Sequence, residues 1–307
     1  MKHNIQVTAI LILAFLIIQI FGLVAISQNT IVAVTPEGVV TVVHEDTVVG
    51  ERPQMQDWVS FAYILFGILI GTLLILFFVR FGQFRLWKGM YFLAIWMASS
   101  ITLGVFISAY VALILALIMA LLEIYRTNIF IHNVTELFVY PGIAILFVPL
   151  FSVPWAMLLL IAISAYDMFA VWKSKHMITL AKFQTESKAF AGFIVPYEKK
   201  GGLSGIKTKI PDEIGGKGGT KVAILGGGDI AFPLLFAGVV MDWLIRTVHL
   251  TKFDALLQST VISLLAALAL LLLFVKAGKD KFYPAMPFIS AGCFAGLGIV
   301  WALNFLV

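Results

Sequence analysis

The sequence predicts an all-α polytopic membrane protein with nine transmembrane helices, a cytoplasmic N-terminus and a C-terminus outside. The composition, the lengths of the apolar runs and the placement of basic residues predict this. Of the 307 residues, 61% are hydrophobic and 12% are charged, whereas soluble domains are roughly 25% charged. A mean hydropathy of +1.04 excludes a water-soluble globule of this length. Cys293 is the only cysteine, which excludes an internal disulfide and a cysteine-based metal site.

The apolar runs have the lengths that bilayer spans need, which is about 20 residues each. The run 89–122 is too long for one helix and divides into two short spans. Another long run divides at Pro154, because proline favours the first turn of a helix. We interpret the first span as a retained helix, since its apolar run exceeds the core of a signal peptide. The expected spans are 7–26, 58–79, 89–106, 108–125, 133–152, 154–172, 222–245, 254–275 and 283–304.

Lysine and arginine provide a test of this count, because they concentrate in cytoplasmic loops. With the N-terminus inside, every basic residue except Arg52, Arg246 and Lys252 lies on the cytoplasmic side. Merging 89–106 with 108–125 would make the division much less clean. Nine spans therefore fit best.

The loops divide the chain into three regions. Residues 1–172 hold the first six helices, and their outer loop 28–57 carries alternating valines that predict a small hairpin. Residues 173–221 form a loop with ten lysines and many glycines, which we expect to be cytoplasmic, mobile and close to anionic lipid. Within it, 189–197 is interpreted as a short amphipathic or membrane-skimming segment. Residues 222–307 hold the last three helices.

Some acidic residues near the spans have simple interpretations. Glu123 and Glu136 flank an inner loop, and we expect both to reach water there. Asp242 precedes Arg246 by four residues, the spacing of an ion pair along one helix. These acids predict no chemistry.

Asp167 and Asp229 lie deeper. Asp167 is six residues before Lys173 and Asp229 is eight after Lys221, which places them about 9 and 12 Å from the same surface. Two antiparallel helices would bring the carboxylates level. An acid at mid-bilayer costs about 2.5–3.5 kcal/mol, which favours a function for both. Two neighbouring carboxyls share a proton, so one can activate water while the other protonates the scissile amide. This is the chemistry of an aspartic protease.

Three glycines directly precede Asp229, and each costs about 1 kcal/mol relative to alanine inside a helix. We expect Gly226, Gly227 and Gly228 to let a substrate backbone or the sixth span approach closely. Loosened helix there would also admit water to the site, and Pro233 would leave a nearby carbonyl without its helical partner. The simpler alternative is a small-residue packing surface beside a satisfied acid.

Three motifs resemble those of one family. Tyr166-Asp167 in the sixth span and the Gly-x-Gly-Asp of 226–229 are similar to the two catalytic motifs of the presenilin and signal peptide peptidase family. The segment 283–287, "YPAMP", is similar to its Pro-Ala-Leu motif, with Met286 in place of leucine. Motif order, nine spans and the long loop before the seventh span agree with this resemblance. The short loops look most like the archaeal homologues.

The resemblance implies an intramembrane aspartyl protease of a prokaryotic cell membrane, which cleaves substrate transmembrane helices within the lipid bilayer. It implies no metal, no cofactor and no nucleic acid, and it leaves the oligomeric state open. Asp167 and Asp229 would be the catalytic pair. The residues implied to shape the site or to hold unwound substrate are Tyr166, Gly226, Gly227, Gly228, Pro284, Ala285, Met286 and Pro287. We expect unwound substrate to pair with the backbone of 284–287, where prolines would leave carbonyls free.

Two other functions remain open from the residues alone. A prepilin-peptidase-like protease also uses a Gly-x-Gly-Asp acid, although no lysine soon follows the motif here. An ion-coupled secondary transporter could use paired intramembrane acids and a broken helix, but the first half of the chain offers no matching broken helix.

Overall fold

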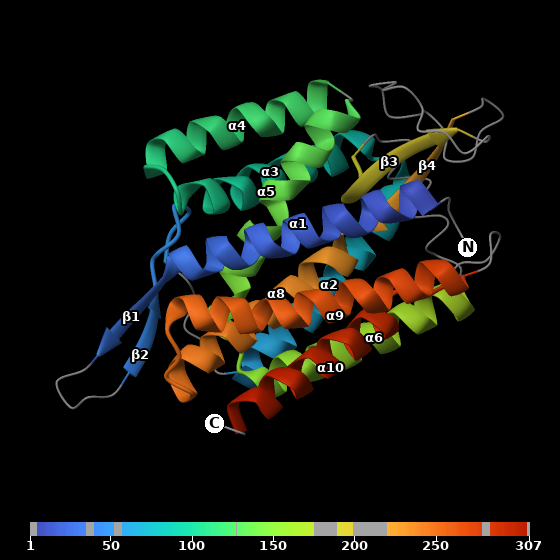
Figure 1. Cartoon of the computed structure of the whole chain (residues 1–307). Helices are drawn as coiled ribbons and strands as arrows, with labels where there is room; N and C mark the ends of the chain where they lie inside the picture. Colours follow the sequence, from blue (N-terminus) through green and yellow to red (C-terminus); the bar gives the residue numbers. More distant parts are fainter. Residues whose placement is uncertain are drawn as a thin grey trace.

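The computed structural model describes residues 5–34, 40–51, 57–126, 128–174, 189–198, 220–277 and 283–305. These residues form a helical bundle with a small two-stranded sheet at each end (Figure 1). The α-helices among them are α1 (Ile5–Asn29), α2 (Asp57–Phe81), α3 (Phe84–Gly104), α4 (Ala109–Tyr125), α5 (Ile129–Phe147), α6 (Val153–Phe169), α8 (Gly227–Thr247), α9 (Lys252–Lys276) and α10 (Met286–Phe305). A 3₁₀ turn, η1 (Val148–Leu150), and a π-helical turn, η2 (Ala170–Ser174), extend α5 and α6. The strands are β1 (Thr30–Val34), β2 (Val40–His44), β3 (Gly192–Glu198) and β4 (Thr220–Gly226).

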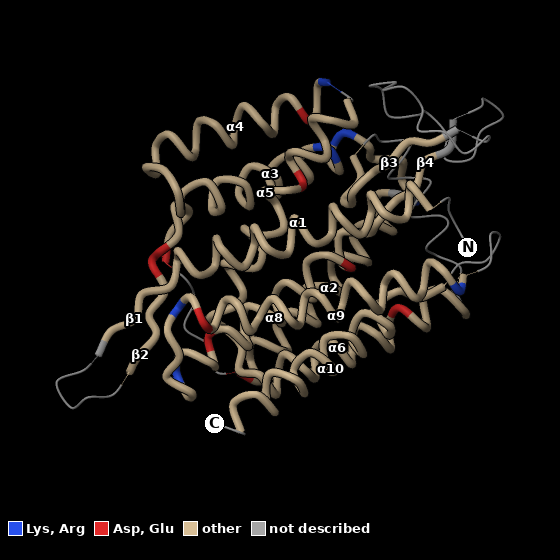
Figure 2. The backbone as a smooth tube through the Cα atoms, in the orientation of Figure 1, with Lys and Arg blue, Asp and Glu red and all other residues tan. Residues whose placement is uncertain are grey.

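Each expected span contains a helix. Within the described residues, seven helices are long and apolar enough to cross a membrane, namely α1, α2, α5, α6, α8, α9 and α10. The helix α4 has only 17 residues, and α3 carries Arg85 and Lys88 near its start. Charged positions gather toward the two ends of the bundle, as expected for helices whose middles face lipid (Figure 2).

The helix α8 lies at the centre of the bundle. Buried residues make up 72% of its apolar window, against 11% in α2. Small residues permit close packing around it: a side chain at Gly238 would overlap Val148 and Ile26. Such small-residue contacts are how helices associate in lipid, where burial gives no hydrophobic gain. The fold therefore holds α8, which carries Asp229, rigidly.

The loop between α1 and α2 contains the predicted hairpin. β1 and β2 pair antiparallel, from Thr30 opposite His44 at the base. His44 Nε2 lies 2.6 Å from Asp242 Oδ2 on α8, and Lys252 Nζ donates to the Thr30 carbonyl at 2.6 Å. The expected Asp242–Arg246 pair is secondary: its shortest distance is 3.9 Å, and Asp242 is only 5% exposed. The hairpin brings in the closer partner, which helix spacing could not show.

The second sheet corrects two expectations. Residues 192–198 are strand β3, not a membrane-skimming segment, and pair antiparallel with β4 from Gly192↔Gly226 to Glu198↔Thr220. The seventh helix accordingly begins at Gly227, not at residue 222. Both strands contain β-branched residues, which favour strands, and the backbone groups along their shared edge pair with each other. The remaining parts of the predicted mobile loop, 175–188 and 199–219, lie outside the described residues.

The expectation that Glu123 and Glu136 reach water is also wrong. They are 4% and 1% exposed, and His132 lies with them in the packed region between α3, α4 and α5. The packing of α3, α4 and α5 on one another encloses these side chains.

Candidate active site

Asp167 sits in the last turn of α6 and caps a different helix. Its Oδ2 accepts a hydrogen bond from the Met286 backbone N–H at 3.1 Å, and the Ala285 amide stabilises the same carboxylate. Since α10 begins at Met286, Asp167 lies at a helix N-terminus, where free N–H groups and the helix dipole favour an anion. One turn away, the Ser164 and Ser290 hydroxyls lie 2.9 Å apart and tie α6 to α10. The carboxylate is thus held in place by two helices.

Asp229 sits in the first turn of α8. Gly226 ends β4 in an extended conformation and forms the N-cap of the helix, so a strand leads directly into the acid. The Gln19 side chain of α1 donates to the Ile230 carbonyl at 2.8 Å and is itself bonded to Ser263 of α9 at 3.3 Å. This buried amide braces the turn that carries Asp229. Asp229, like Asp167, benefits from a helix N-terminus.

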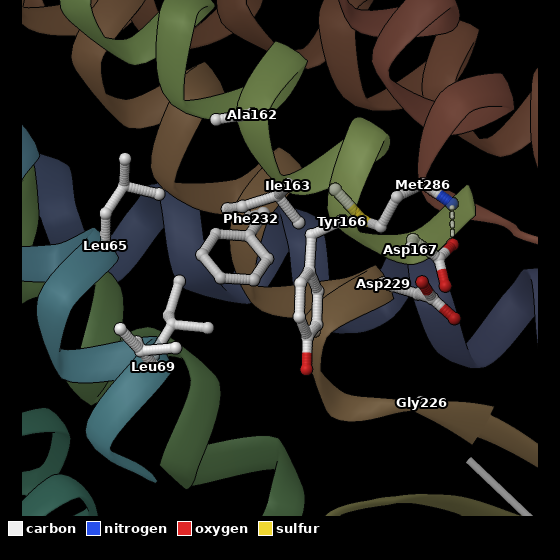
Figure 3. A pocket seen from close by; sticks show the side chains of 12 residues that line it. Leu65, Leu69, Ala162, Ile163, Tyr166, Asp167, Gly226, Asp229, Phe232 and Met286 are labelled. Atoms are coloured by element: carbon white, nitrogen blue, oxygen red, sulfur yellow. Dashed lines mark hydrogen bonds between the residues drawn. The ribbon is translucent and has the colours of Figure 1, made fainter. Parts of the chain in front are cut away.

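The two carboxylates lie side by side at one end of an apolar cavity (Figure 3). The cavity has a volume of about 410 Å³ and is walled by α2, α6, α8 and the start of α10. Its lining residues are Leu65, Ile68, Leu69, Ala162, Ile163, Tyr166, Asp167, Gly226, Gly228, Asp229, Phe232 and Met286. Charges in such surroundings interact more strongly than in water, which suits electrostatic catalysis.

The structure brings most of the expected site residues to this cavity. Six line it: Tyr166, Asp167, Gly226, Gly228, Asp229 and Met286. Four do not, namely Gly227, Pro284, Ala285 and Pro287. Ala285 still acts on the site through its amide. The Tyr166 hydroxyl lies 3.3 Å from Thr72 Oγ1, across the gap between α6 and α2.

The three glycines do not make room for α6. A Cβ at Gly226 would lie 3.1 Å from Asp229 Oδ2, and one at Gly228 would lie 3.5 Å from the Phe232 ring. At Gly227 it would meet Tyr140 of α5 at 3.1 Å. The close neighbour of the glycine turn is therefore α5. The glycines leave room for the Asp229 carboxylate itself, for Phe232 and for Tyr140.

Sequence reasoning missed the apolar walls of the cavity. Ala162 and Ile163 lie one turn before Tyr166, and Phe232 is three residues after Asp229, so helical spacing could have indicated them. The α2 residues 65, 68 and 69 carry no such signal. Leucine and isoleucine fill every span, so only packing shows which ones face the cavity.

A membrane-spanning helical bundle with two carboxylates on one apolar cavity is the arrangement expected of a membrane-embedded aspartic protease. A family profile described as "Signal-peptide peptidase, presenilin aspartyl protease" matches residues 21–305, and the chain belongs to this family. Among solved structures, the chain is similar to "a presenilin family intramembrane aspartate protease", with a TM-score of 0.59 and 15% identity. That match covers 96% of this chain and 99% of the other, and at this identity it shows the shared fold. The comparison with curated proteins gave no match.

The family resemblance seen in the motifs is thereby confirmed. The protein is an intramembrane aspartic endopeptidase and an integral multi-pass membrane protein. The transporter and prepilin-peptidase alternatives are set aside.

Proposed function

We propose that this protease hydrolyses peptide bonds within the transmembrane helices of its substrates, with Asp167 and Asp229 as the catalytic dyad. One observation carries the proposal: the two carboxylates face each other on an apolar cavity, each at the N-terminus of a helix. Ionisable residues within a membrane are costly and therefore indicate a functional site. Two carboxyls at one cavity can act as a general acid and a general base.

The dyad would act through one shared proton. The ionised carboxylate removes a proton from water, whose oxygen adds to the scissile carbonyl carbon, while the protonated carboxyl donates to the carbonyl oxygen. When the tetrahedral intermediate collapses, the C–N bond breaks, and the amide nitrogen takes the proton that the first carboxylate removed from water. The second carboxylate takes a proton from a hydroxyl of the intermediate, so that the pair again shares one proton. The Met286 N–H holds Asp167 in position throughout. The pH profile of kcat then reports the dyad as a pair.

The loosely packed α2 offers an entrance for substrate. It contributes Leu65, Ile68 and Leu69 to the cavity but buries little of its own surface. We infer that a substrate helix reaches the dyad between α2 and α6, past the Tyr166–Thr72 contact. A cavity of about 410 Å³ holds a few side chains but no intact helix. The substrate must unwind there, because its helical carbonyls are otherwise hydrogen-bonded.

The unwound strand needs a partner for its backbone. The expectation for residues 284–287 rested on free carbonyls, but the Ala285 carbonyl accepts from Phe288 and Ile289, and the Met286 amide donates to Asp167. In the described part of the chain, β4 pairs on one edge with β3 alone. Since β4 runs directly into the dyad, its other edge is the better template for strand addition.

We infer the orientation from the lysine distribution. The dyad end of the bundle would face the cytoplasm, with α3 and α4 counted among nine crossings. The start of α1 and the end of α10 lie at opposite ends of the bundle, which supports an odd number of crossings (Figure 1). By resemblance to the archaeal homologues, the membrane would be a prokaryotic cell membrane.

The test uses purified wild-type protein beside Asp167→Ala and Asp229→Ala in detergent. Each receives a peptide with one transmembrane span that contains a helix-weakening residue, and mass spectrometry identifies the fragments. We expect cuts inside the span from the wild type and from Asp254→Ala, a control acid exposed at the start of α9. Full cleavage by either dyad variant would overturn the assignment.

A further inference from the structure

Residues of three helices, α3, α5 and α8, form hydrogen bonds to the backbone of a short segment that precedes β4 in the chain. Residues 189–194 lead into and begin β3, and side chains of α3 and α5 donate to their carbonyls. The bonds run from Trp87 Nε1 to Ala189 O (3.1 Å), Tyr91 Oη to Phe190 O (2.8 Å), Gly227 N to Ala191 O (3.3 Å), His132 Nε2 to Gly192 O (2.6 Å) and Asn133 Nδ2 to Ile194 O (2.8 Å). We call Trp87, Tyr91, His132 and Asn133 the clasp.

Asn133 is the most specific member of the clasp. Its side-chain amide donates to the Ile194 carbonyl, and its Oδ1 accepts from the Ile194 N–H at 3.0 Å. The amide thus imitates a neighbouring strand and fixes the register of β3 against α5. Because only backbone atoms of the segment are bonded, the clasp sets its position independently of its side chains.

The clasp is connected directly to Asp229. Gly192 pairs with Gly226 at the end of the sheet, and Asp229 follows three residues later. The Ala191 carbonyl, between two clasped residues, also accepts from Gly227 N–H in the first turn of α8. A displacement of β3 would therefore move the strand–helix junction on which the carboxylate stands.

Buried charged groups orient the clasp. His132 Nδ1 lies 2.6 Å from Glu123 Oε1 on α4, and both residues are almost fully buried. The Gly192 carbonyl can only accept, so His132 Nε2 carries a proton, and the Nδ1–Glu123 contact holds a second one. Glu123 thereby fixes the ring orientation, as outer carboxylates do for functional histidines. Apolar residues would fill this space with a smaller desolvation cost, so the presence of the buried His132–Glu123 pair favours a functional role for these two residues.

The helix α5 also contacts the turn that precedes Asp229. Glu136 accepts from Tyr91 of the clasp at 3.3 Å. Tyr140 is one turn further along α5, and its ring lies against Gly227, two residues before Asp229. The helix α5 thus contacts the strand–helix junction before Asp229 twice, through its clasp residues on β3 and through Tyr140 on Gly227.

We propose that His132 and Asn133, with Glu123 orienting His132, are positioning residues that place the Asp229 carboxylate opposite Asp167. The inference rests on the proposed function of the dyad and extends it. These residues touch neither substrate nor the reacting atoms. Their effect is transmitted through β3, β4 and the glycine junction.

The experiment compares kcat and KM for cleavage of the single-span peptide at a temperature well below every variant's Tm. His132→Ala and Asn133→Leu should lose about 10- to 100-fold in kcat, the scale expected for a misplaced catalytic group, with little change in KM. His132→Gln should regain part of the loss, because its amide can donate to the Gly192 carbonyl. Asn133→Leu keeps the branching of the side chain and removes both hydrogen bonds to Ile194 without removing an ionisable group. It therefore tests the proposal even if His132→Ala does not fold.

The matched control is His44→Gln. His44 also lies 2.6 Å from a buried carboxylate, Asp242, which is 13 residues after Asp229 on α8, or about 20 Å along the helix. Loss of the His44–Asp242 contact should lower Tm and leave kcat close to the wild-type value. An equal fall in kcat for His44→Gln, or wild-type kcat in Asn133→Leu, would overturn the proposal.

The dyad variants distinguish failure of the positioning role from failure of the proposed catalytic function. If Asp167→Asn and Asp229→Asn are inactive while the clasp variants cleave like wild type, only the positioning role fails. If the dyad variants also cleave normally, the proposed function fails as well.

Discussion

The hydrogen bond from the Met286 backbone to Asp167 can be removed by one substitution, Met286→Pro. The donor is a main-chain N–H, so among ordinary residues only proline abolishes it. Met286 is the first residue of α10, where the N–H has no partner within the helix and proline is well tolerated. The helix should therefore form without the bond.

The expected loss follows from the strength of that bond. A hydrogen bond to a charged group contributes about 1.5–3 kcal/mol. If the dyad needs Asp167 fixed in its charged form, this corresponds to a fall in kcat of about 10- to 150-fold. Substrate affinity should change less, because most of the cavity wall is unaltered.

Two controls isolate the backbone donor from the Met286 side chain, which also lines the cavity. Met286→Ala shortens the side chain and keeps the N–H. Met286→Leu keeps both the N–H and the approximate volume, and restores the leucine of the related motif. Cleavage of the single-span peptide by each variant gives kcat and KM, and thermal unfolding shows that each is folded. Equal kcat for Met286→Pro and Met286→Ala would refute the role of the hydrogen bond.

Two further predictions concern glycines, with Gly298→Ala as a common control because nothing lies within 4 Å of its added Cβ. Gly226→Ala would place a Cβ 3.1 Å from Asp229 Oδ2, so the carboxylate must shift by a few tenths of an ångström. This shift should lower kcat about tenfold while Tm stays nearly unchanged. An unchanged kcat would contradict this prediction. Gly292→Leu would place its Cβ 2.6 Å from the Leu265 carbonyl of α9, and this overpacking should cost about 1–3 kcal/mol. Thermal unfolding should show a Tm lower by about 2–10 °C, and a Tm equal to that of Gly298→Ala would show that the α9–α10 contact yields freely.

Local properties of the sequence were enough for the helices and for the central acids. The length of an apolar run and the charges that bound it are readable without any contact, so each expected span contains a helix. The valine alternation in the loop between α1 and α2 likewise predicted the β1–β2 hairpin, because both strands are close in the sequence. The motifs around Asp167 and Asp229 identified the family because they belong to short stretches of chain.

Only the tertiary structure decided what surrounds those acids. β3 and β4 are separated by residues 199–219, so their pairing is a contact between distant parts of the chain. Side chains of α5 bond to β3, and Tyr91 of α3 bonds to the residue two positions before it. Glu123 and His132 face each other because α4 turns back onto α5, a contact that no spacing along one helix predicts.

The walls of the cavity were equally hidden. In a bilayer, leucine and isoleucine are as well placed against lipid as against protein, so composition does not tell which face of α2 lines the site. The sequence alone determined which segments form apolar helices and which two acids belong to the family motifs. The packing of the helices decided which groups hold those acids in place, because that depends on contacts between residues far apart in the chain.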